Sequence, residues 1–304
     1  MGGLSDVYRG TWSAPNGPDV PVALKVVRLP GASRERVLNK LEHEFLVWKT
    51  LRHPNILELC GIHLGLGEYP AMVSPWCKGG DIVSYLKKHE NGPNIKDLKL
   101  KALVEVLQGL QYLHERDPPI VHGDLKGANI LVSTTGEALL CDFGLASVFD
   151  EHSTSQNSPP KGTCRWMARE LFMRDDARHT TYSDIWAFGC VALELISGER
   201  PFCTISKDQQ VIIALYRGDL PYRPQTVPDS MWRLMLECWT LEPTDRPSVH
   251  AILQRMLGES LVDLRCSAPW SMRNRIVRSV SPWSARARSG GRRTCSPHQI
   301  FPVA

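Results

Sequence analysis

The segment His122-Gly123-Asp124-Leu125-Lys126-Gly127-Ala128-Asn129 decides the fold that the sequence predicts. Its glycines and charged residues indicate a loop, and it follows Leu98–Glu115, a stretch in which apolar residues recur with a helical period. A second short motif, Asp142-Phe143-Gly144, begins thirteen residues after Asn129. The oxygen atoms of Asp and Asn side chains are ligands that Mg²⁺ prefers, so this part of the chain is a candidate site for phosphate chemistry.

Closer to the N-terminus, Val22-Ala23-Leu24-Lys25 lies on a predicted strand, Val20–Val27. Each of the three motifs is weak alone, but their order, spacing and strand or loop contexts agree with one another. In these respects the chain resembles the catalytic domain of eukaryotic protein kinases and is most similar to the tyrosine-kinase-like (TKL) group of serine/threonine kinases. The resemblance covers residues 2–258. It implies an α+β fold of two lobes, a small one with an antiparallel sheet and one helix, and a larger, mostly helical one.

The predicted elements agree with this architecture, because strand-like runs dominate the first part of the chain and helical periods the second. Strands are expected at Asp6–Gly10, Val20–Val27, Leu57–Ile62 and Ala71–Val73, and helices at Arg34–Leu51, Asp81–Lys88, Leu98–Glu115, Tyr182–Ser197, Gln209–Tyr216, Ser230–Trp239 and Val249–Leu257. The predicted domains are a small lobe at 1–73, a hinge at 74–80, a large lobe at 81–262 and a basic, disordered tail at 263–304.

The resemblance implies transfer of the γ-phosphoryl group of ATP. The transition state of this reaction is loose, so the protein mainly positions groups and neutralises charge. Lys25 would hold the α- and β-phosphates as a point cation. A carboxylate must orient this lysine, and the resemblance implies Glu44, with Glu42 as the competing candidate.

The catalytic and metal-binding residues follow from the same resemblance. Asp124 would accept the proton of the substrate hydroxyl, and Asn129 and Asp142 would bind Mg²⁺. Lys126, two residues after Asp124, resembles the lysine of serine/threonine kinases that contacts the γ-phosphate. Gly162-Thr163, before Trp166-Met167-Ala168, also favours serine/threonine substrates, although additional action on tyrosine stays open.

The resemblance also implies an adenine site formed by both lobes. Ser74 resembles the gatekeeper, Pro75-Trp76-Cys77 the hinge, and Asp81 a ribose contact. The apolar residues expected around adenine are Val7, Ala23 and Leu131.

Residues that support the site are implied as well. Asp184 resembles the anchor of the catalytic loop, and Glu170 and Arg246 resemble a buried ion pair in the large lobe. A stack that joins the lobes is expected from Trp48, Leu59, His122 and Phe143.

The sequence departs from the family pattern at three places. The chain begins inside the glycine-rich loop, with Gly2 and Gly3 present and Ser5 at the third glycine position, so the first strand of a five-stranded sheet is expected to be missing. Gly123 replaces the arginine that pairs with a phosphorylated activation segment, so activity is expected not to require phosphorylation there. Arg169 replaces a proline, with an expected effect on local stiffness only.

Composition limits the remaining possibilities. Nine scattered cysteines without a C-x-x-C pair indicate reduced thiols in a soluble, cytoplasmic protein, and no apolar run is long enough for a membrane span. Residues 265–304 contain eight arginines and no acidic residue. Nucleic-acid or acidic-membrane binding by this tail is the less favoured interpretation. A solvated, disordered extension or a sequence translated through an unspliced intron is favoured.

The sequence therefore predicts an ATP- and Mg²⁺-dependent protein serine/threonine kinase, monomeric as kinases of this type often are. The alternative is a pseudokinase or nucleotide-binding scaffold, in which the incomplete glycine-rich loop leaves little turnover. A small-molecule kinase is disfavoured, because Gly162–Glu170 and Asp245-Arg246-Pro247 resemble the large lobe of peptide kinases.

Overall fold

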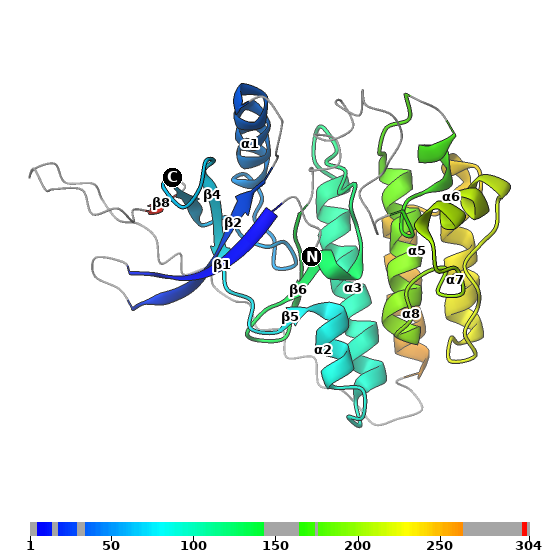
Figure 1. The fold of residues 1–304 in the computed structure, drawn as a ribbon. Coiled ribbons are helices and arrows are strands. Elements are labelled where there is room, and N and C mark those ends of the chain that lie inside the picture. Colours follow the sequence, from blue (N-terminus) through cyan, green and yellow to red (C-terminus); the bar gives the residue numbers. More distant parts are fainter. Residues whose placement is uncertain are drawn as a thin grey trace, which may run out of the picture.

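The computed structural model of the chain describes residues 5–13, 18–28, 34–142, 164–173, 176–263 and 300–302. These residues form two lobes, a sheet accompanied by one helix and a mostly helical unit beside it (Figure 1). The expected α+β, two-lobe fold is therefore confirmed. No helix in the described part of the chain has both the length and the apolar character that crossing a membrane requires.

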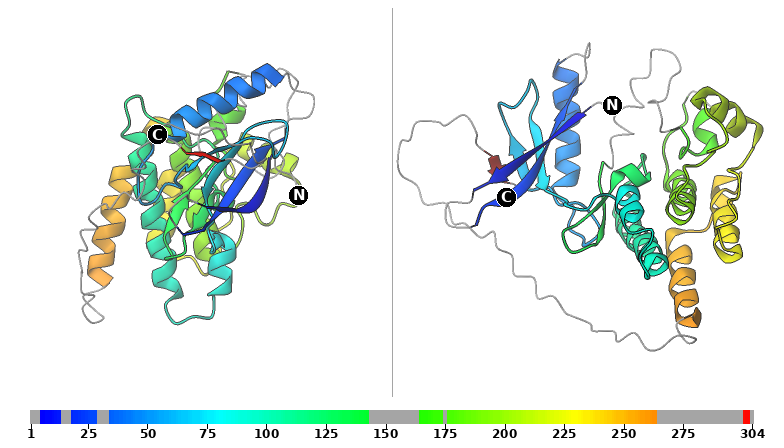
Figure 2. Two further views of the ribbon diagram at one scale, coloured as in Figure 1. Left: turned by 90° about the vertical axis from the view of Figure 1, so that its left-hand side faces the viewer. Right: turned by 60° about the horizontal axis from the view of Figure 1, so that its bottom comes forward.

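The small lobe contains one antiparallel sheet with the strand order β1-β2-β4-β3-β8. The strands are β1 (Ser5–Trp12), β2 (Val20–Val27), β3 (Gly61–His63), β4 (Ala71–Pro75) and β8 (Ile300–Pro302). Helix α1 (Arg34–Trp48) lies against this sheet (Figure 2).

Strand β2 determines which face of the sheet carries the functional lysine. Side chains alternate between the two faces of a strand, so Val22, Leu24 and Val26 share one face and pack with β4 in a small core of their own. Lys25 and Val27 lie on the other face, and Val27 packs into the main core. Because that core also contains residues of α1, Lys25 lies on the face that this helix covers.

The last part of the chain departs from the expectation. No regular structure was predicted for residues 263–304, yet Ile300–Pro302 forms β8 and pairs with β3 in antiparallel register. The sheet therefore has five strands, the fifth being added at the edge opposite to β1. The prediction was wrong for these three residues, because a sheet edge can order a segment that has no preference of its own. Residues 264–299 lie outside the described part of the chain.

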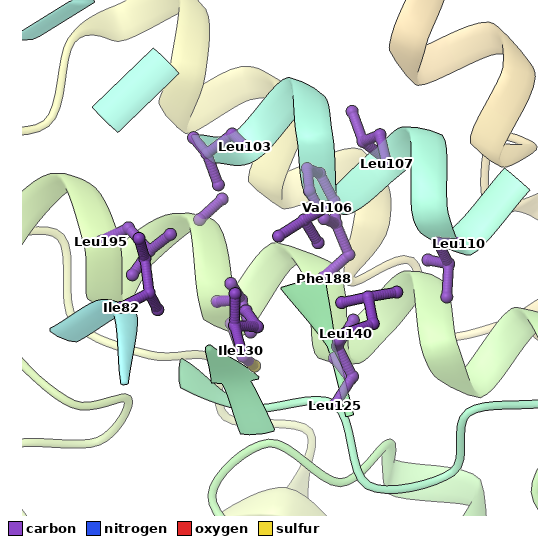
Figure 3. Packing of buried hydrophobic residues seen from close by; sticks show 14 of the residues in the cluster. Ile82, Leu103, Val106, Leu107, Leu110, Leu125, Ile130, Leu140, Phe188 and Leu195 are labelled. Carbon is purple, nitrogen blue, oxygen red and sulfur yellow. The ribbon is translucent and has the colours of Figure 1, made fainter. Parts of the chain in front are cut away.

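The large lobe is built around two long helices, α3 (Ile95–His114) and α5 (Thr181–Ser197). The other elements are α2 (Ile82–Lys88), η2 (Arg169–Phe172), α6 (Asp208–Arg217), α7 (Asp229–Cys238), η3 (Pro243–Asp245) and α8 (Val249–Asp263). Apolar side chains of α3, α5 and the strands beside them form its core (Figure 3). Leu103, Val106, Leu110 and Phe188 are fully buried there.

A small second sheet brings the two ends of the predicted site together. It contains β5 (Gly80–Asp81), β6 (Ile130–Val132) and β7 (Ala138–Leu140), with η1 (Gly127–Asn129) directly before β6. Ile130 pairs with Leu140, and the Cys141 N–H donates to the Asn129 carbonyl at 3.0 Å. The β6–β7 hairpin therefore holds Asn129 and Asp142 at the same end, although thirteen residues separate them.

Candidate active site

Asp124 lies in the loop after α3, and one of its carboxylate oxygens is held by two donors. Lys126 Nζ donates to Oδ2 at 2.6 Å, and Asn129 Nδ2 donates to the same atom at 2.8 Å. Asn129 Nδ2 also donates to the Asp124 backbone carbonyl at 2.8 Å. The second carboxylate oxygen, Oδ1, is buried and has no hydrogen-bond partner among the residues that the structure describes. The carboxylate is thus fixed through one oxygen, and the other can accept a proton from an incoming group.

Asp184, in the first turn of α5, anchors this loop from below. Its Oδ2 accepts hydrogen bonds from the His122 N–H and His114 Nε2, both at 2.8 Å, and its Oδ1 accepts one from the Gly123 N–H at 2.9 Å. Burial acts to raise the pKa of Asp184, but the hydrogen bond and charge of His114 prevail and the pKa is lowered. The expected anchor is confirmed. His114 was not foreseen, because nothing in the spacing connects it with Asp184.

Gly123 has a positive φ of 76°. This left-handed conformation is readily adopted by glycine and is unfavourable for residues with a Cβ atom. The glycine at this position therefore suits the backbone that presents its N–H to Asp184.

Lys25 and Asp142 form an ion pair between the lobes, with 2.7 Å between Nζ and Oδ1. Burial acts to lower the pKa of Lys25, but the carboxylates of Asp142 and Glu44 outweigh it and the pKa is raised. Burial acts to raise the pKa of Asp142, but Lys25 holds it below its ordinary value. Both groups are therefore charged at neutral pH.

Glu44 is buried on α1, whereas Glu42, the competing candidate, is exposed. The expected ion pair between Lys25 and Glu44 is not formed, since Lys25 is paired with Asp142 instead. Burial, opposed in part by Lys25, raises the pKa of Glu44 to about 7. The choice of Glu44 over Glu42 agrees with burial, but the partner predicted for Lys25 is wrong in this structure. Lys25 binds Asp142 instead, and burial of Glu44 favours its neutral form.

Asn129 and Asp142 fit the requirements of a Mg²⁺ site for a nucleotide. The Asn129 amide nitrogen is used by Asp124, which leaves the amide oxygen as a ligand. Asp142 is ionised and lies at the same end of the hairpin. The described residues contain no group of three or more His, Cys, Asp or Glu side chains that could hold a metal ion. One carboxylate and one amide suit Mg²⁺, which keeps waters and phosphate oxygens as its other ligands.

The residues expected around adenine lie on neighbouring strands. In the sheet register, Val7 is opposite Lys25, Ala23 is opposite Ser74, and Leu131 is opposite Asp81. Ser74 is buried, Trp76 and Cys77 are half-buried, and Val7 is 59% exposed. Asp81 caps α2 by accepting a hydrogen bond from the Ser84 N–H at 2.9 Å. Ser5 begins β1, whereas Gly2 and Gly3 lie outside the described residues.

Three members of the expected inter-lobe stack are buried, namely Trp48, Leu59 and His122. Trp48 Nε1 donates to the Leu57 carbonyl at 2.6 Å, which fixes the indole at the end of α1. Phe143 lies outside the described residues, and so do Gly162, Thr163 and the segment whose phosphorylation was predicted to be unnecessary. The complete stack stays a prediction.

The expected pair of Glu170 and Arg246 is confirmed. Arg246 Nη1 and Nη2 each donate to a carboxylate oxygen of Glu170 at 2.7 Å. Arg246 also donates to the Tyr182 carbonyl at 2.9 Å and to the Thr240 carbonyl at 3.0 Å. The buried arginine makes these four hydrogen bonds, so it connects η2 to α5 and to the residues after α7.

Two further polar residues support the loop and were missed from the sequence. Glu194 Oε2 accepts hydrogen bonds from the Gly127 N–H and from Trp166 Nε1, both at 3.1 Å. The buried Arg165 binds backbone carbonyls of the segment between α5 and α6 and the Asp208 carboxylate. No motif separates these two residues from ordinary surface charges, because their partners are mostly backbone groups distant in sequence.

A small hollow, with a volume of about 10 Å³, lies beside the catalytic loop. Its lining includes Gly123, Asp124, Leu125, Trp166 and Met167. The hollow is therefore bounded by the loop that carries Asp124 and by the segment before η2.

Comparison with known families agrees with the fold and the loop. The two lobes, with Lys25 from the sheet and Asp124 and Asp142 from the larger lobe, define the class of kinase folds. The family described as "Protein tyrosine and serine/threonine kinase" matches residues 1–256, and the chain belongs to this family.

Two relatives show how far the similarity extends. A "Probable serine/threonine-protein kinase drkC" of Dictyostelium discoideum is 30% identical over 257 residues, which cover 84% of this chain and 33% of that protein. A "Mitogen-activated protein kinase kinase kinase zak-1" of Caenorhabditis elegans is 27% identical over 277 residues, with 88% and 35% covered. The chain thus spans about a third of the length of these relatives.

Proposed function

We propose that this chain is a protein serine/threonine kinase that depends on ATP and Mg²⁺ and phosphorylates hydroxyl groups of proteins. The observation that carries the proposal is the geometry of Asp124, in which Oδ2 is held by Lys126 and Asn129 while Oδ1 is buried and has no partner in the described part of the chain. A carboxylate fixed in this way is suited to align a hydroxyl and accept its proton. The two relatives named above carry names of protein kinases, one of them of a serine/threonine kinase.

The other residues take roles that follow from their charge. Lys25 would bind the α- and β-phosphates, and Lys126 would neutralise charge on the γ-phosphate. When bound at Asn129 and Asp142, Mg²⁺ would supply positive charge to the phosphates. The substrate peptide would lie on the surface beside Asp124 and Trp166, which line the small hollow there.

A pseudokinase or nucleotide-binding scaffold is the second candidate, and one observation favours it. Lys25 is paired with Asp142 and not with Glu44, so two groups needed for nucleotide binding neutralise each other. For phosphoryl transfer, phosphates and Mg²⁺ must replace this pair, and Glu44 must lose its proton to orient Lys25. Cytoplasmic location, a monomeric state and the absence of nucleic-acid partners remain part of the first proposal.

Transfer of phosphate from ATP to a generic basic protein tests the proposal. The wild type is compared with Asp124→Asn, which keeps an acceptor oxygen for Lys126 but cannot take up a proton. We expect the variant to lose activity by about 10²-fold or more. Glu237→Gln, a change to an exposed ion pair on α7, is the matched control and should keep full activity.

Two results would decide between the candidates. Equal transfer rates for the wild type and Asp124→Asn would mean that the signal is contamination, and the scaffold would then be preferred. Phosphoamino-acid analysis of the product should show phosphoserine or phosphothreonine, and phosphotyrosine alone would contradict the assigned specificity.

A further inference from the structure

The outer edge of the small-lobe sheet is occupied by the chain itself. Strand β8 pairs with β3 through three residues, with Phe301 opposite Ile62. Ile62 lies opposite Met72, and Met72 lies opposite Lys25. A single row of paired residues therefore runs from the segment at 300–302 across the sheet to the lysine of the candidate active site.

Backbone alternation shows which groups of β3 face this edge. The Trp76 N–H donates to the Pro21 carbonyl at 3.0 Å, so the backbone N–H and C=O groups of Trp76 face β2. Because these groups alternate in direction along a strand, the backbone groups of Val73, three residues earlier, face β3. The Cys60 N–H donates to the Val73 carbonyl at 2.8 Å, which agrees with this direction. Gly61 is opposite Val73 and uses its backbone groups there, so the backbone groups of Ile62 face β8.

This pattern explains how a proline is accommodated in β8. If Ile62 and Phe301 face each other with their N–H and C=O groups, the backbone groups of Ile300 and Pro302 point away from β3. Proline has no N–H group, and within a sheet it is tolerated at an edge where that group would face outward. The sequence Ile300-Phe301-Pro302 is thus compatible with an edge strand in this register and not in the register shifted by one residue.

We propose that the edge of β3 opposite to β4 is a docking site for an extended peptide segment, and that residues 300–302 of the same chain occupy it. Such strand addition uses main-chain hydrogen bonds along a strand edge that the rest of the sheet leaves unpaired, and β3 has this edge because strands β1, β2 and β4 all lie on its other side. Docking adds a strand to the sheet that carries Lys25. We therefore expect it to stabilise the paired strands between β8 and this lysine.

The length of the intervening chain suits an intramolecular contact. Thirty-six residues separate Asp263, the end of α8, from Ile300. A chain of this length can reach up to about 120 Å, which is enough to connect the two segments. A contact within one chain has a higher effective concentration than the same contact between two molecules, which favours a short strand that would bind weakly in trans.

Hydrogen exchange at the Ile62 amide tests the proposal in the full chain. Phe301→Pro removes the N–H group that faces Ile62, whereas Ile300→Pro removes one that faces away. We expect exchange at Ile62 to become about tenfold faster, or more, in Phe301→Pro and to stay near the wild-type rate in Ile300→Pro. Unchanged exchange at the buried amides of α5 shows that the large lobe remains folded.

The outcomes separate the possible occupants of the edge. Equal Ile62 exchange in the wild type and Phe301→Pro would overturn the proposal. Protection that increases with protein concentration would indicate a second copy as the occupant and would also overturn it. A synthetic peptide of residues 296–304 that restores protection to Phe301→Pro, while the same peptide N-methylated at Phe301 does not, would support the docking site.

Discussion

Lys25 and Asp142 are 117 residues apart in the sequence, and their side chains meet at 2.7 Å between the two lobes. Glu44 lies close enough to interact electrostatically with both of them. Burial is the main cause of the raised pKa of Glu44; Lys25 lowers this pKa in part, and Asp142 raises it further. The candidate active site therefore contains one cation shared between two carboxylates, of which one is charged and the other is near its titration point at neutral pH.

Asp142→Asn should lower the pKa of Glu44 below about 7. The substitution removes a negative charge that raises this pKa, and it frees Lys25 to interact with Glu44. The pKa can be followed by ¹³C NMR titration of the Glu44 carboxyl group. Asp229→Asn, at a fully exposed position on α7, is the control and should leave the titration unchanged. A Glu44 pKa that stays the same or rises in Asp142→Asn would show that the lysine is not shared.

Glu44→Gln should change how stability depends on pH. The ordinary pKa of 4.5 is raised in the folded protein to about 7, so the fold favours protonated Glu44 and loses stability as the pH rises between these values. The loss amounts to about 3 kcal/mol across this window and is absent from the variant. Urea unfolding at several pH values between 4.5 and 8 measures it.

The difference in unfolding free energy between Glu44→Gln and the wild type isolates this group from others that titrate in the same range, such as Glu194. The unfolding free energy of the variant, relative to that of the wild type, should increase up to about pH 7 and then level off. Glu35→Gln, at an exposed position in the first turn of α1, should keep the wild-type profile. A difference that does not vary with pH would contradict the raised pKa.

Glu170→Gln should destabilise the large lobe by about 3 kcal/mol, because it leaves the buried Arg246 without its counter-charge. The matched control is Glu237→Gln, which breaks the ion pair with Arg255. Those side chains are 45% and 43% exposed, so the control should cost less than about 1 kcal/mol. Urea denaturation of both variants measures the contrast. Equal losses would mean that burial of the arginine does not set the energy of the pair.

Gly123→Ala should destabilise the protein by about 1 kcal/mol or more, because a Cβ atom is unfavourable at a φ of 76°. It should also reduce phosphoryl transfer, since the Gly123 N–H fixes the catalytic loop on Asp184. Gly258→Ala is the control, and its expected effect on stability has the opposite sign. This glycine lies inside α8, where a Cβ atom would meet open space, and the alanine should stabilise the helix by up to about 1 kcal/mol. Thermal unfolding of the two variants should therefore shift in opposite directions.

The local sequence pattern predicted the helices and strands well. Hydrophobic periodicity and the residues that end a helix or strand depend only on a few neighbouring positions. Strand β2 and the start of α1 agree with the expected positions, while β3 is only Gly61–His63 where a longer strand, Leu57–Ile62, was expected. Leu57 and Leu59 are buried core residues, so their apolar character comes from packing and not from a strand. Apolar runs alone do not separate these two cases.

The sequence by itself determined the family, the two-lobe fold and the identity of the polar residues around Asp124, because these depend on motif order and spacing. Only the tertiary structure decided that Lys25 binds Asp142, that Glu44 is near neutrality, and that residues 300–302 join the small-lobe sheet. Each of these is a choice between competing partners. Such choices are set by distance and burial in three dimensions, which residue spacing along the chain does not encode.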